Sequence, residues 1–256
     1  MIEPTWSAGD VQLWRGDCLE ILPTLPAGSV DAIIGDIPYG TTACSWDVVI
    51  PFEPMWECVE HVLKSRGAFV TTASQPFTSM LVMSKLDWFK YEWVWDKVNR
   101  YTQFLDVKRK PLKRHDNIVV FYKEQCKYYP QMTSGMPYTS TRPKVRSPKV
   151  YGKYIPTDLI NDGYRYPHTI LKIKGKTKDS QESHPTQKPV ALYEYLIRTY
   201  TDAGDTVLDM TMGSGTTLVA AHKTGRRGMG IEKRQDYFDI AVARIQDAQR
   251  QPPLFV

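Results

Sequence analysis

Four consecutive residues, Asp36-Ile37-Pro38-Tyr39, combine groups that could activate an amine on an aromatic base. Such an amine is a poor nucleophile because its lone pair is delocalised into the ring. The Asp36 carboxylate and the Ile37 carbonyl could accept hydrogen bonds from the amine protons, which favours a pyramidal nitrogen. Pro38 restricts Ile37 to an extended backbone and aims that carbonyl, while Tyr39 offers a flat face for an extruded base. An ordinary strand end followed by a turn is the alternative interpretation.

A second candidate site follows a predicted strand at 206–209, where a glycine turn leads into a helix. Gly213 and Gly215 let the backbone turn sharply and approach a ligand, at the junction where open α/β sheets bind nucleotides. Glu232 ends the next predicted strand and could accept hydrogen bonds from ribose hydroxyls. Asp209 precedes the glycines and could hold the ammonium of a bound amino acid, which suits S-adenosyl-methionine better than a pyrophosphate. A tight turn with an ordinary surface glutamate is the alternative.

Apolar runs and helical spacing predict the elements that position both sites. Their alternation predicts a parallel sheet covered by helices on both faces. Residues 123–182 show no sustained periodicity and hold seven of the 15 tyrosines, which predicts a loop-rich insertion or small lobe. Strands are expected at 11–14, 30–34, 68–72, 91–95, 118–122, 206–209 and 228–231, and helices at 51–64 (stopped by Gly67), 77–86, 189–200, 216–223 and 237–249.

Length and composition suit one globular domain with an insertion: 256 residues, of which 42% are hydrophobic. The four cysteines lack the spacing of zinc ligands, so we predict reduced thiols and no metal site. The N-terminal segment does not resemble a signal peptide. No apolar run approaches the roughly 20 residues that span a bilayer. These features predict a soluble, cytoplasmic protein.

The net charge of +5 is unevenly distributed along the chain. Residues 123–182 contain 12 Lys and Arg against 5 Asp and Glu, whereas the rest of the chain contains 21 against 23. A local basic surface is typical of a protein that binds a polyanion. A solvated, flexible insertion would have a similar composition.

Taken together, these elements resemble the DNA methyltransferases that methylate exocyclic amines. Residues 36–39 resemble the catalytic Asp-Pro-Pro-Tyr of that family, and residues 209–217 resemble its cofactor loop, Asp-Pro-Phe-x-Gly-Ser-Gly-Thr-Thr. The sequence His-Pro-Thr-Gln-Lys-Pro at 184–189 resembles the segment that helps to hold the methionine end of the cofactor. Residues 15–18 resemble the Gly-Asp element near the cofactor's adenine, and residues 119–123 resemble the strand that lines the target-base pocket.

The order of these motifs, catalytic before cofactor, marks the β group of the family. The resemblance implies a Rossmann-like α/β methyltransferase sheet in circularly permuted form, S-adenosyl-methionine as cofactor, and flipping of the target base out of duplex DNA. Residues 1–122 would form the catalytic half, 123–182 the target recognition insertion, and 183–256 the cofactor half. Related enzymes are often dimers, so a homodimer is one implied assembly.

An aspartate at position 36, where some relatives have serine, favours adenine over cytosine by family habit. Ile37 replaces the first proline of the catalytic motif, and Thr211 replaces the phenylalanine of the cofactor loop. Neither change removes a group that must do chemistry. Methylation of cytosine or of RNA, and a DNA-binding regulator with weakened catalysis, remain alternatives.

The resemblance also assigns cofactor and DNA contacts. Ordinary surface charge would explain at least half of the proposed DNA contacts equally well. The implied cofactor residues are Asp17, Cys18, Asp36, His184, Thr186, Lys188, Asp209, Thr211, Gly213, Ser214, Gly215, Thr216, Thr217 and Glu232. The candidate DNA contacts are Arg100, Lys108, Arg109, Lys113 and Arg114 beside the cleft, Lys144, Arg146, Lys149 and Lys153 on phosphates, and Arg142 or Arg165 on a guanine edge.

Overall fold

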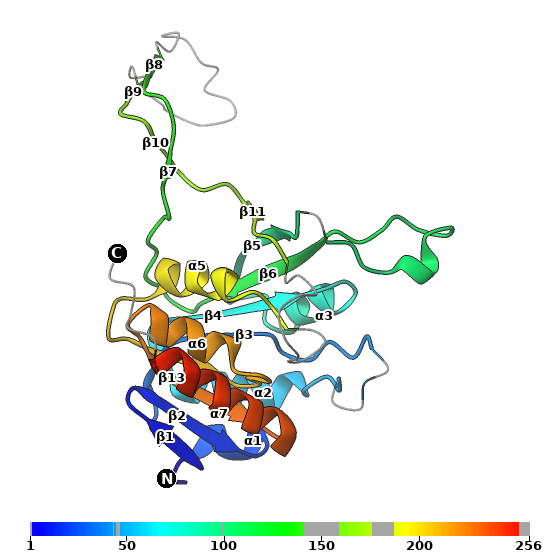
Figure 1. The fold of residues 1–256 in the computed structure, drawn as a ribbon, viewed down its shortest axis with the longest axis vertical. Coiled ribbons are helices and arrows are strands. Elements are labelled where there is room, and N and C mark those ends of the chain that lie inside the picture. The colour runs from blue at the N-terminus through cyan, green and yellow to red at the C-terminus, as the bar shows by residue number, and fades with distance from the viewer. Residues whose placement is uncertain are drawn as a thin grey trace. The chain divides into compact units, whose positions relative to one another are not determined.

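The computed structural model describes residues 2–42, 44, 47–98, 100–140, 159–175 and 187–250. The chain forms two compact units, one comprising residues 1–129 with 169–256, and the other residues 130–168. The first unit is built on one nine-stranded sheet (Figure 1). In spatial order the strands are β1 (Trp6–Ala8), β2 (Val11–Arg15), β13 (Arg227–Glu232), β12 (Thr206–Asp209), β3 (Val30–Gly35), β4 (Leu63–Ala73), β6 (His115–Phe121), β5 (Phe89–Asp96) and β11 (Ile170–Lys172).

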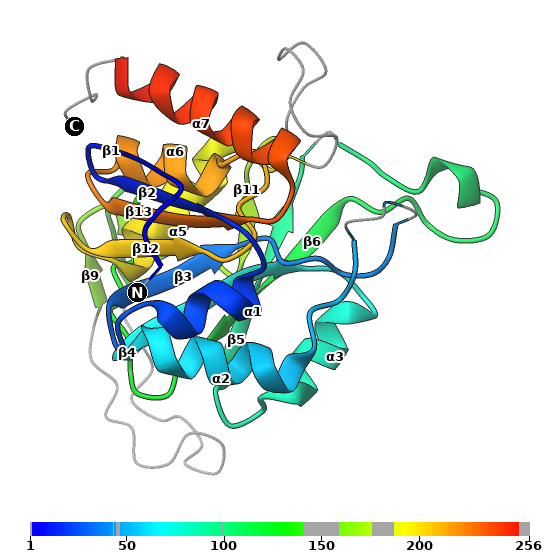
Figure 2. The ribbon, with the colours of Figure 1, turned by 90° about the horizontal axis from the view of Figure 1, so that it is seen from below.

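Helices cover both faces of this sheet, and Figure 2 shows the two layers on either side of the strands. One layer packs on the face that carries Ile33 and Phe69, and the other includes helices that pack on the face that carries Ile34 and Val70. The first layer contains α1 (Cys18–Ile21), the 3-10 turn η1 (Leu22–Thr24), α2 (Phe52–Val62) and α3 (Phe77–Ser84); the second contains α5 (Val190–Tyr200), α6 (Thr216–Lys223) and α7 (Gln235–Arg250).

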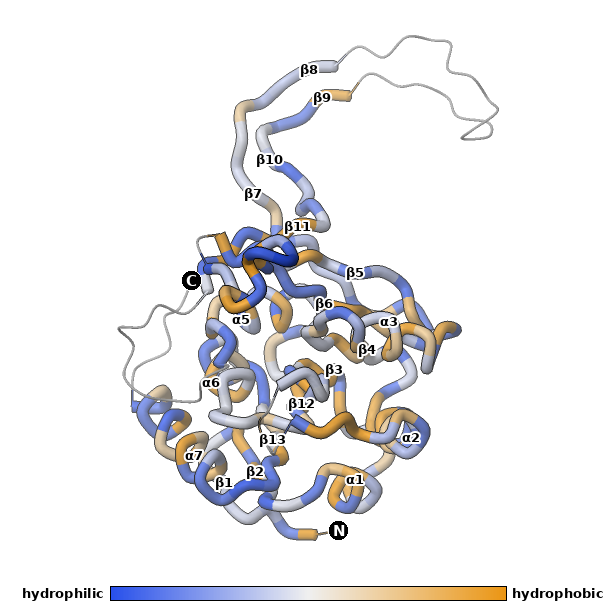
Figure 3. Tube along the Cα trace, turned by 90° about the vertical axis from the view of Figure 1, so that its right-hand side faces the viewer, coloured by the Kyte–Doolittle hydropathy of each residue, from blue (hydrophilic) through white to orange (hydrophobic). Residues whose placement is uncertain are grey.

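The central strands β3 and β4 are apolar on both faces, which explains why they appear in the sequence as continuous apolar runs. Successive side chains of a strand point to opposite faces. Ile33 and Ile34 are therefore both buried, one in each hydrophobic cluster. The helices have only one buried side, and hydrophobic and hydrophilic segments accordingly alternate along the tubes of α2 and α7 in Figure 3.

The topology changes direction between β3 and β12, which are parallel neighbours. From β3 the chain continues through α2 to β4 on one side, and from β12 it continues through α6 to β13 on the other side. Such a switch point leaves a crevice at the carboxyl ends of the two strands, where open α/β sheets bind their ligands. The residues that follow β3 and β12 are those of the two sequence motifs.

Two details of the predicted fold were wrong. The sheet is mixed, because β6 runs antiparallel to both β4 and β5, and β1 runs antiparallel to β2. A buried apolar run has the same appearance in either strand direction, so the sequence 118–122 could not reveal this. Gly67 does not stop a helix; it lies inside β4, which begins at Leu63 directly after α2. A Cβ at Gly67 would lie 2.6 Å from the Leu63 side chain, so glycine is needed there for close packing.

The second unit contains two short antiparallel strand pairs. β7 (Thr133–Ser134) pairs with β10 (Tyr164–Arg165), and β8 (Tyr138–Ser140) pairs with β9 (Leu159–Asn161). The region 123–182 therefore does not form one unit: residues 130–168 belong to the second unit, whereas β11 pairs with β5 in the main sheet. Among the described residues, no helix is long and apolar enough to cross a membrane.

Candidate active site

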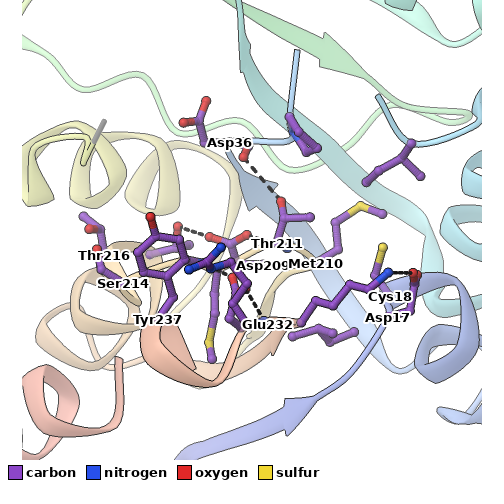
Figure 4. A pocket seen from close by; sticks show the side chains of 18 of the residues that line it. Asp17, Cys18, Asp36, Asp209, Met210, Thr211, Ser214, Thr216, Glu232 and Tyr237 are labelled. Carbon is purple, nitrogen blue, oxygen red and sulfur yellow. Dashed lines mark hydrogen bonds and ion pairs between the residues drawn. The ribbon is translucent and has the colours of Figure 1, made fainter. Parts of the chain in front are cut away.

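Four acidic residues that are far apart in the sequence meet at one edge of the sheet. Asp36 follows β3, Asp209 ends β12, Glu232 ends β13 and Asp17 lies two residues after β2. These four strands are parallel to one another, so their carboxyl ends share the same edge. All four acids line a single cavity of about 480 Å³ (Figure 4), a size typical of small-ligand sites.

The carboxylate of Asp36 is surrounded by donors. It accepts hydrogen bonds from the hydroxyls of Tyr39 and Thr72, and it forms an ion pair with the ammonium of Lys188. Thr211, in the glycine turn, donates from its hydroxyl to the Asp36 carbonyl at 3.3 Å. The catalytic motif and the cofactor loop are thus in direct contact. The Asp36 oxygen that pairs with Lys188 retains capacity for a hydrogen bond from a substrate amine, because a carboxylate oxygen can accept two.

Tyr39 is turned inward in this state. Its ring stacks on Phe77 with centroids 5.2 Å apart and an interplanar angle of 25°. Burial raises the pKa of Tyr39 well above its usual value, so its hydroxyl stays protonated and serves as a donor to Asp36. The Lys188 ammonium also lies over this ring, 5.8 Å from its centroid. Lys188 or Tyr39 must therefore move before a target base can stack on the ring.

Asp47 organises the loop that follows the catalytic motif, although the sequence carries no local signal for it. One carboxylate oxygen accepts from the backbone amides of Tyr39 and Gly40, both at 2.8 Å, and the other from Thr41 at 2.9 Å and Thr42 at 2.7 Å. Although burial opposes ionisation, these hydrogen bonds hold the pKa of Asp47 below its usual value. A single buried carboxylate therefore fixes the backbone next to Asp36.

We expect D47A to lower the turnover number by about tenfold to a hundredfold, because four backbone amides lose their acceptor and the catalytic turn is no longer held in one geometry. D47N should retain an intermediate rate, since an amide oxygen can replace part of the acceptor. Steady-state kinetics with each variant will test this, with the exposed Glu53 on α2 (E53Q) as control. An equal loss in cofactor affinity and turnover would contradict a role confined to the catalytic turn.

Asp209 is buried beside the catalytic motif. Its carboxylate accepts from the Thr217 hydroxyl at 2.6 Å and from the Thr211 amide at 3.1 Å. Burial raises the pKa of Asp209 to about 7. The neighbouring strand leaves room for this carboxylate only because position 35 is glycine: a Cβ on Gly35 would lie 2.5 Å from one Asp209 oxygen. The buried Tyr193 interacts with both Thr72 and Thr217, so it links the Asp36 and Asp209 environments.

The glycine turn is held from two sides. Glu232 accepts from the Gly213 amide at 3.0 Å and the Arg234 amide at 2.8 Å, which leaves further acceptor capacity on both of its oxygens. From α7, the Arg244 guanidinium donates to the Ser214 carbonyl and to its hydroxyl at 2.9 Å. Gly215 has φ of 74°, and a Cβ there would lie 2.9 Å from the Ala241 side chain, so only glycine fits without strain.

The opposite end of the cavity is formed by Asp17 and Cys18. Asp17 caps α1 by accepting from the Leu19 amide at 2.9 Å, and it lies 3.1 Å from the Lys233 ammonium. Burial raises the pKa of the Cys18 thiol to about 12, so this side chain is a neutral, apolar part of the wall at neutral pH. The acidic wall suits S-adenosyl-methionine, which carries a cationic ammonium, a cationic sulfonium and ribose hydroxyl donors.

The remaining predicted site residues have varied locations. Lys188, Ser214, Thr216 and Thr217 line the cavity, whereas Gly215 caps α6. His184 and Thr186 lie outside the described residues, as do Arg142, Lys144, Arg146, Lys149 and Lys153. Arg165 lies in the second unit, where its guanidinium donates to the Met136 carbonyl and stacks on Tyr138 at 4.7 Å. Arg100, Lys108, Arg109, Lys113 and Arg114 lie in the connection between β5 and β6.

The fold and the cavity define a methyltransferase of the circularly permuted Rossmann-like type, and comparison with known proteins specifies the family. The model of the DNA methylase family (N6_N4_Mtase) matches residues 30–243. The chain is 26% identical to the type II methyltransferase M.ScaI of Streptomyces caespitosus, over 95% of this chain and 84% of that protein. It is 28% identical to the type II methyltransferase M.HpaI of Haemophilus parainfluenzae, over 92% of this chain and 74% of that protein.

Solved structures show the same fold. The M1.HpyAVI–SAM complex superposes with a TM-score of 0.61 at 23% identity, covering 92% of this chain and 98% of that one. The PvuII DNA methyltransferase, described as cytosine-N4-specific, superposes with a TM-score of 0.67 at 17% identity, covering 97% and 94% of the two chains. This chain belongs to the DNA methylase family: it is a DNA methyltransferase that uses S-adenosyl-methionine and acts on an exocyclic amine, N6 of adenine or N4 of cytosine.

Proposed function

We propose that this protein methylates the N6 amine of adenine at a specific site in duplex DNA, after flipping the base out of the helix. The observation that carries the proposal is the position of Asp36, a carboxylate acceptor that lines the same cavity as Asp209 and Glu232. Adenine is supported by the carboxylate at position 36, as in the Asp-Pro-Pro-Tyr motif that these residues resemble. Base flipping is supported by geometry, because an amine within a stacked duplex cannot reach an acceptor that lines a cavity at a sheet edge.

The residues of the cavity would hold the cofactor by its polar ends. The Asp209 carboxylate would bind the ammonium, Glu232 would accept from the ribose hydroxyls, and Asp17 would lie near the adenine. When bound, S-adenosyl-methionine supplies an electrophilic methyl group: the amine nitrogen forms a bond to carbon as the carbon–sulfur bond breaks, and sulfur keeps the electron pair.

The chain's own residues would orient and activate the amine. Asp36 would accept a hydrogen bond from one amine proton through the oxygen that pairs with Lys188, and the Ile37 carbonyl would accept from the other. Localising the lone pair in this way directs it towards the methyl group, and positioning supplies most of the acceleration. The proton lost after methyl transfer would pass to Asp36 or to water.

We also propose that residues 123–182 contain the target recognition region and that the enzyme takes part in restriction–modification. The relatives M.ScaI and M.HpaI are named as type II methyltransferases, which supports this context. The concentration of Lys and Arg in residues 123–182 supports contact with DNA there.

Incubation of the purified protein with unmethylated genomic DNA and methyl-labelled S-adenosyl-methionine, followed by nucleoside analysis, tests the proposal. We expect label in N6-methyldeoxyadenosine, and sequencing of the modified positions would then define the recognised site. Label in N4-methyldeoxycytidine would replace adenine by cytosine as the target. A protein that binds the cofactor and DNA but transfers no label would instead be a DNA-binding regulator.

A further inference from the structure

A projecting arm at the catalytic edge of the sheet has an apolar tip that the methyl transfer chemistry does not use. The arm, residues 97–114, connects β5 to β6. In Figures 1 and 2 the green segment between these strands extends away from the sheet. β3 is parallel to β4, and β6 is antiparallel to both β4 and β5, so β5 runs in the same direction as β3. The arm therefore leaves the sheet at the edge where Asp36 lies.

The base of the arm is firmly held and adjoins the catalytic residues. The buried Asp116 forms ion pairs with Lys97 at 2.6 Å and Lys113 at 2.5 Å. Although burial opposes ionisation, these two lysines hold the pKa of Asp116 below its usual value. Lys113 also donates to the hydroxyl of Ser74, two residues beyond the Thr72 that donates to Asp36. The arm is thus attached next to the catalytic carboxylate.

The outer part of the arm is a defined turn. The backbones of Thr102 and Lys113 pair through hydrogen bonds of 2.8 and 3.2 Å. Beyond them lies the 3-10 turn η2 (Phe104–Asp106), and the Asp106 carbonyl accepts from the amides of Arg109 at 2.8 Å and Lys110 at 3.0 Å. The tip thus has its own backbone hydrogen bonds.

The side chains at the tip are apolar and exposed. Leu105 has a relative exposure of 102%, Phe104 of 62% and Val107 of 54%. Exposed apolar groups gathered on a projection are unfavourable in water and mark an interaction site. Three side chains provide far less than the roughly 800 Å² per partner that a stable protein dimer needs. The tip is therefore unsuited to be a dimer interface by itself.

The charge of the arm identifies the partner. Residues 97–114 contain seven Lys and Arg and a single acidic residue, Asp106, which is paired with Lys110 at 3.1 Å. Lys108 and Arg109 are exposed next to the apolar tip. Apolar wedges flanked by basic residues are the means by which proteins enter duplex DNA between base steps, with the cations on the phosphates.

We propose that the tip of this arm, Phe104 and Leu105 with Val107, inserts into the duplex beside the target base pair and occupies the space that the flipped base leaves. The inference rests on the proposed base-flipping function and adds the element that stabilises the extruded state. Lys108 and Arg109 contact the flanking phosphates. Filling the gap offsets the loss of stacking, which costs a few kcal/mol when a base leaves the helix.

The proposal is tested with L105A and the double variant F104A/L105A on two oligonucleotide duplexes that contain the methylated site. In one duplex the target base is paired, and in the other it lies opposite an abasic position. We expect kcat/KM on the paired duplex to fall by about tenfold to a hundredfold, and on the abasic duplex by less than about threefold, because that base is already unpaired. Affinity for S-adenosyl-methionine should not change.

Leu86 offers a matched control, because it is 58% exposed and precedes the opposite, amino end of β5. L86A should match the wild type on both duplexes. Wild-type activity of L105A and F104A/L105A on the paired duplex would overturn the proposal, as would an equal loss on both duplexes, which would indicate general DNA contact rather than gap filling.

A readout without turnover separates this proposal from the proposed function. In L105W, addition of duplex DNA should quench the extra tryptophan emission through stacking on bases, whereas the emission of L86W should not change. If the wild type fails to methylate DNA, the proposed function is wrong, yet the emission of L105W still decides whether the tip meets bases. Unquenched emission in a complex with bound DNA would overturn the insertion.

Discussion

D36A will lower the turnover number by about a hundredfold to ten thousandfold while the protein stays folded and binds S-adenosyl-methionine. Alanine removes the acceptor that orients the amine. Loss of a group that accepts a proton or stabilises charge in the transition state typically lowers the reaction rate by this factor. Single-turnover methyl transfer, with cofactor binding measured in parallel by calorimetry, tests this expectation. Wild-type turnover in D36A would exclude the proposed mechanism.

The asparagine variant sharpens the same test. Asp36 is surrounded by three donors, from Tyr39, Thr72 and Lys188. In D36N the amide nitrogen must face at least one of these donors or the substrate amine, so D36N should be nearly as slow as D36A. D31N is a suitable control, because Asp31 lies in the same strand and pairs with Lys64 at 2.7 Å, away from the cavity.

The second large effect concerns Asp209 and pH. Because burial raises the pKa of Asp209 to about 7, the ligand-free protein at pH 6 holds this carboxyl mostly protonated, and only the carboxylate can pair with the cofactor's ammonium. Cofactor affinity should therefore rise about tenfold between pH 6 and pH 7.5 and then level off. D209N should bind the cofactor about a hundredfold more weakly than the wild type at pH 8, with no such pH dependence.

The stability of the ligand-free protein should change with pH in the opposite direction to its cofactor affinity, because of the same carboxyl group. Its pKa is higher in the folded state than in the unfolded chain, so its stabilising contribution is complete below pH 4 and is lost as pH rises through about 7. Between pH 5 and pH 8 the wild type should lose roughly 3 kcal/mol in free energy of unfolding relative to D209N. Urea denaturation of both proteins at the two pH values measures this difference. Parallel pH curves for the two proteins would show that Asp209 is already ionised in the folded state.

The sequence alone determined the parts of this site whose geometry is local. Asp36 directly follows its strand and Pro38 restricts the backbone of Ile37, and the turn at Gly213 and Gly215 requires the left-handed backbone that glycine adopts at φ of 50° and 74°. The backbone conformation of such motifs is determined by a few neighbouring residues. Their chemistry, the cofactor and the family could therefore be predicted before any contact was known.

Only the tertiary structure decided what surrounds these motifs. Asp36 and its neighbours are contacted by side chains from separate elements, namely Thr72, Lys188 and Tyr193. These contacts depend on strand order and register, so no spacing in the sequence predicts them. The direction of β6 and the exposure of Leu105 have the same origin, because an apolar residue in the sequence carries no information on whether another layer covers it. The local motifs specify the chemistry of this protein, and the packing of distant elements sets the charge, the burial and the access under which that chemistry occurs.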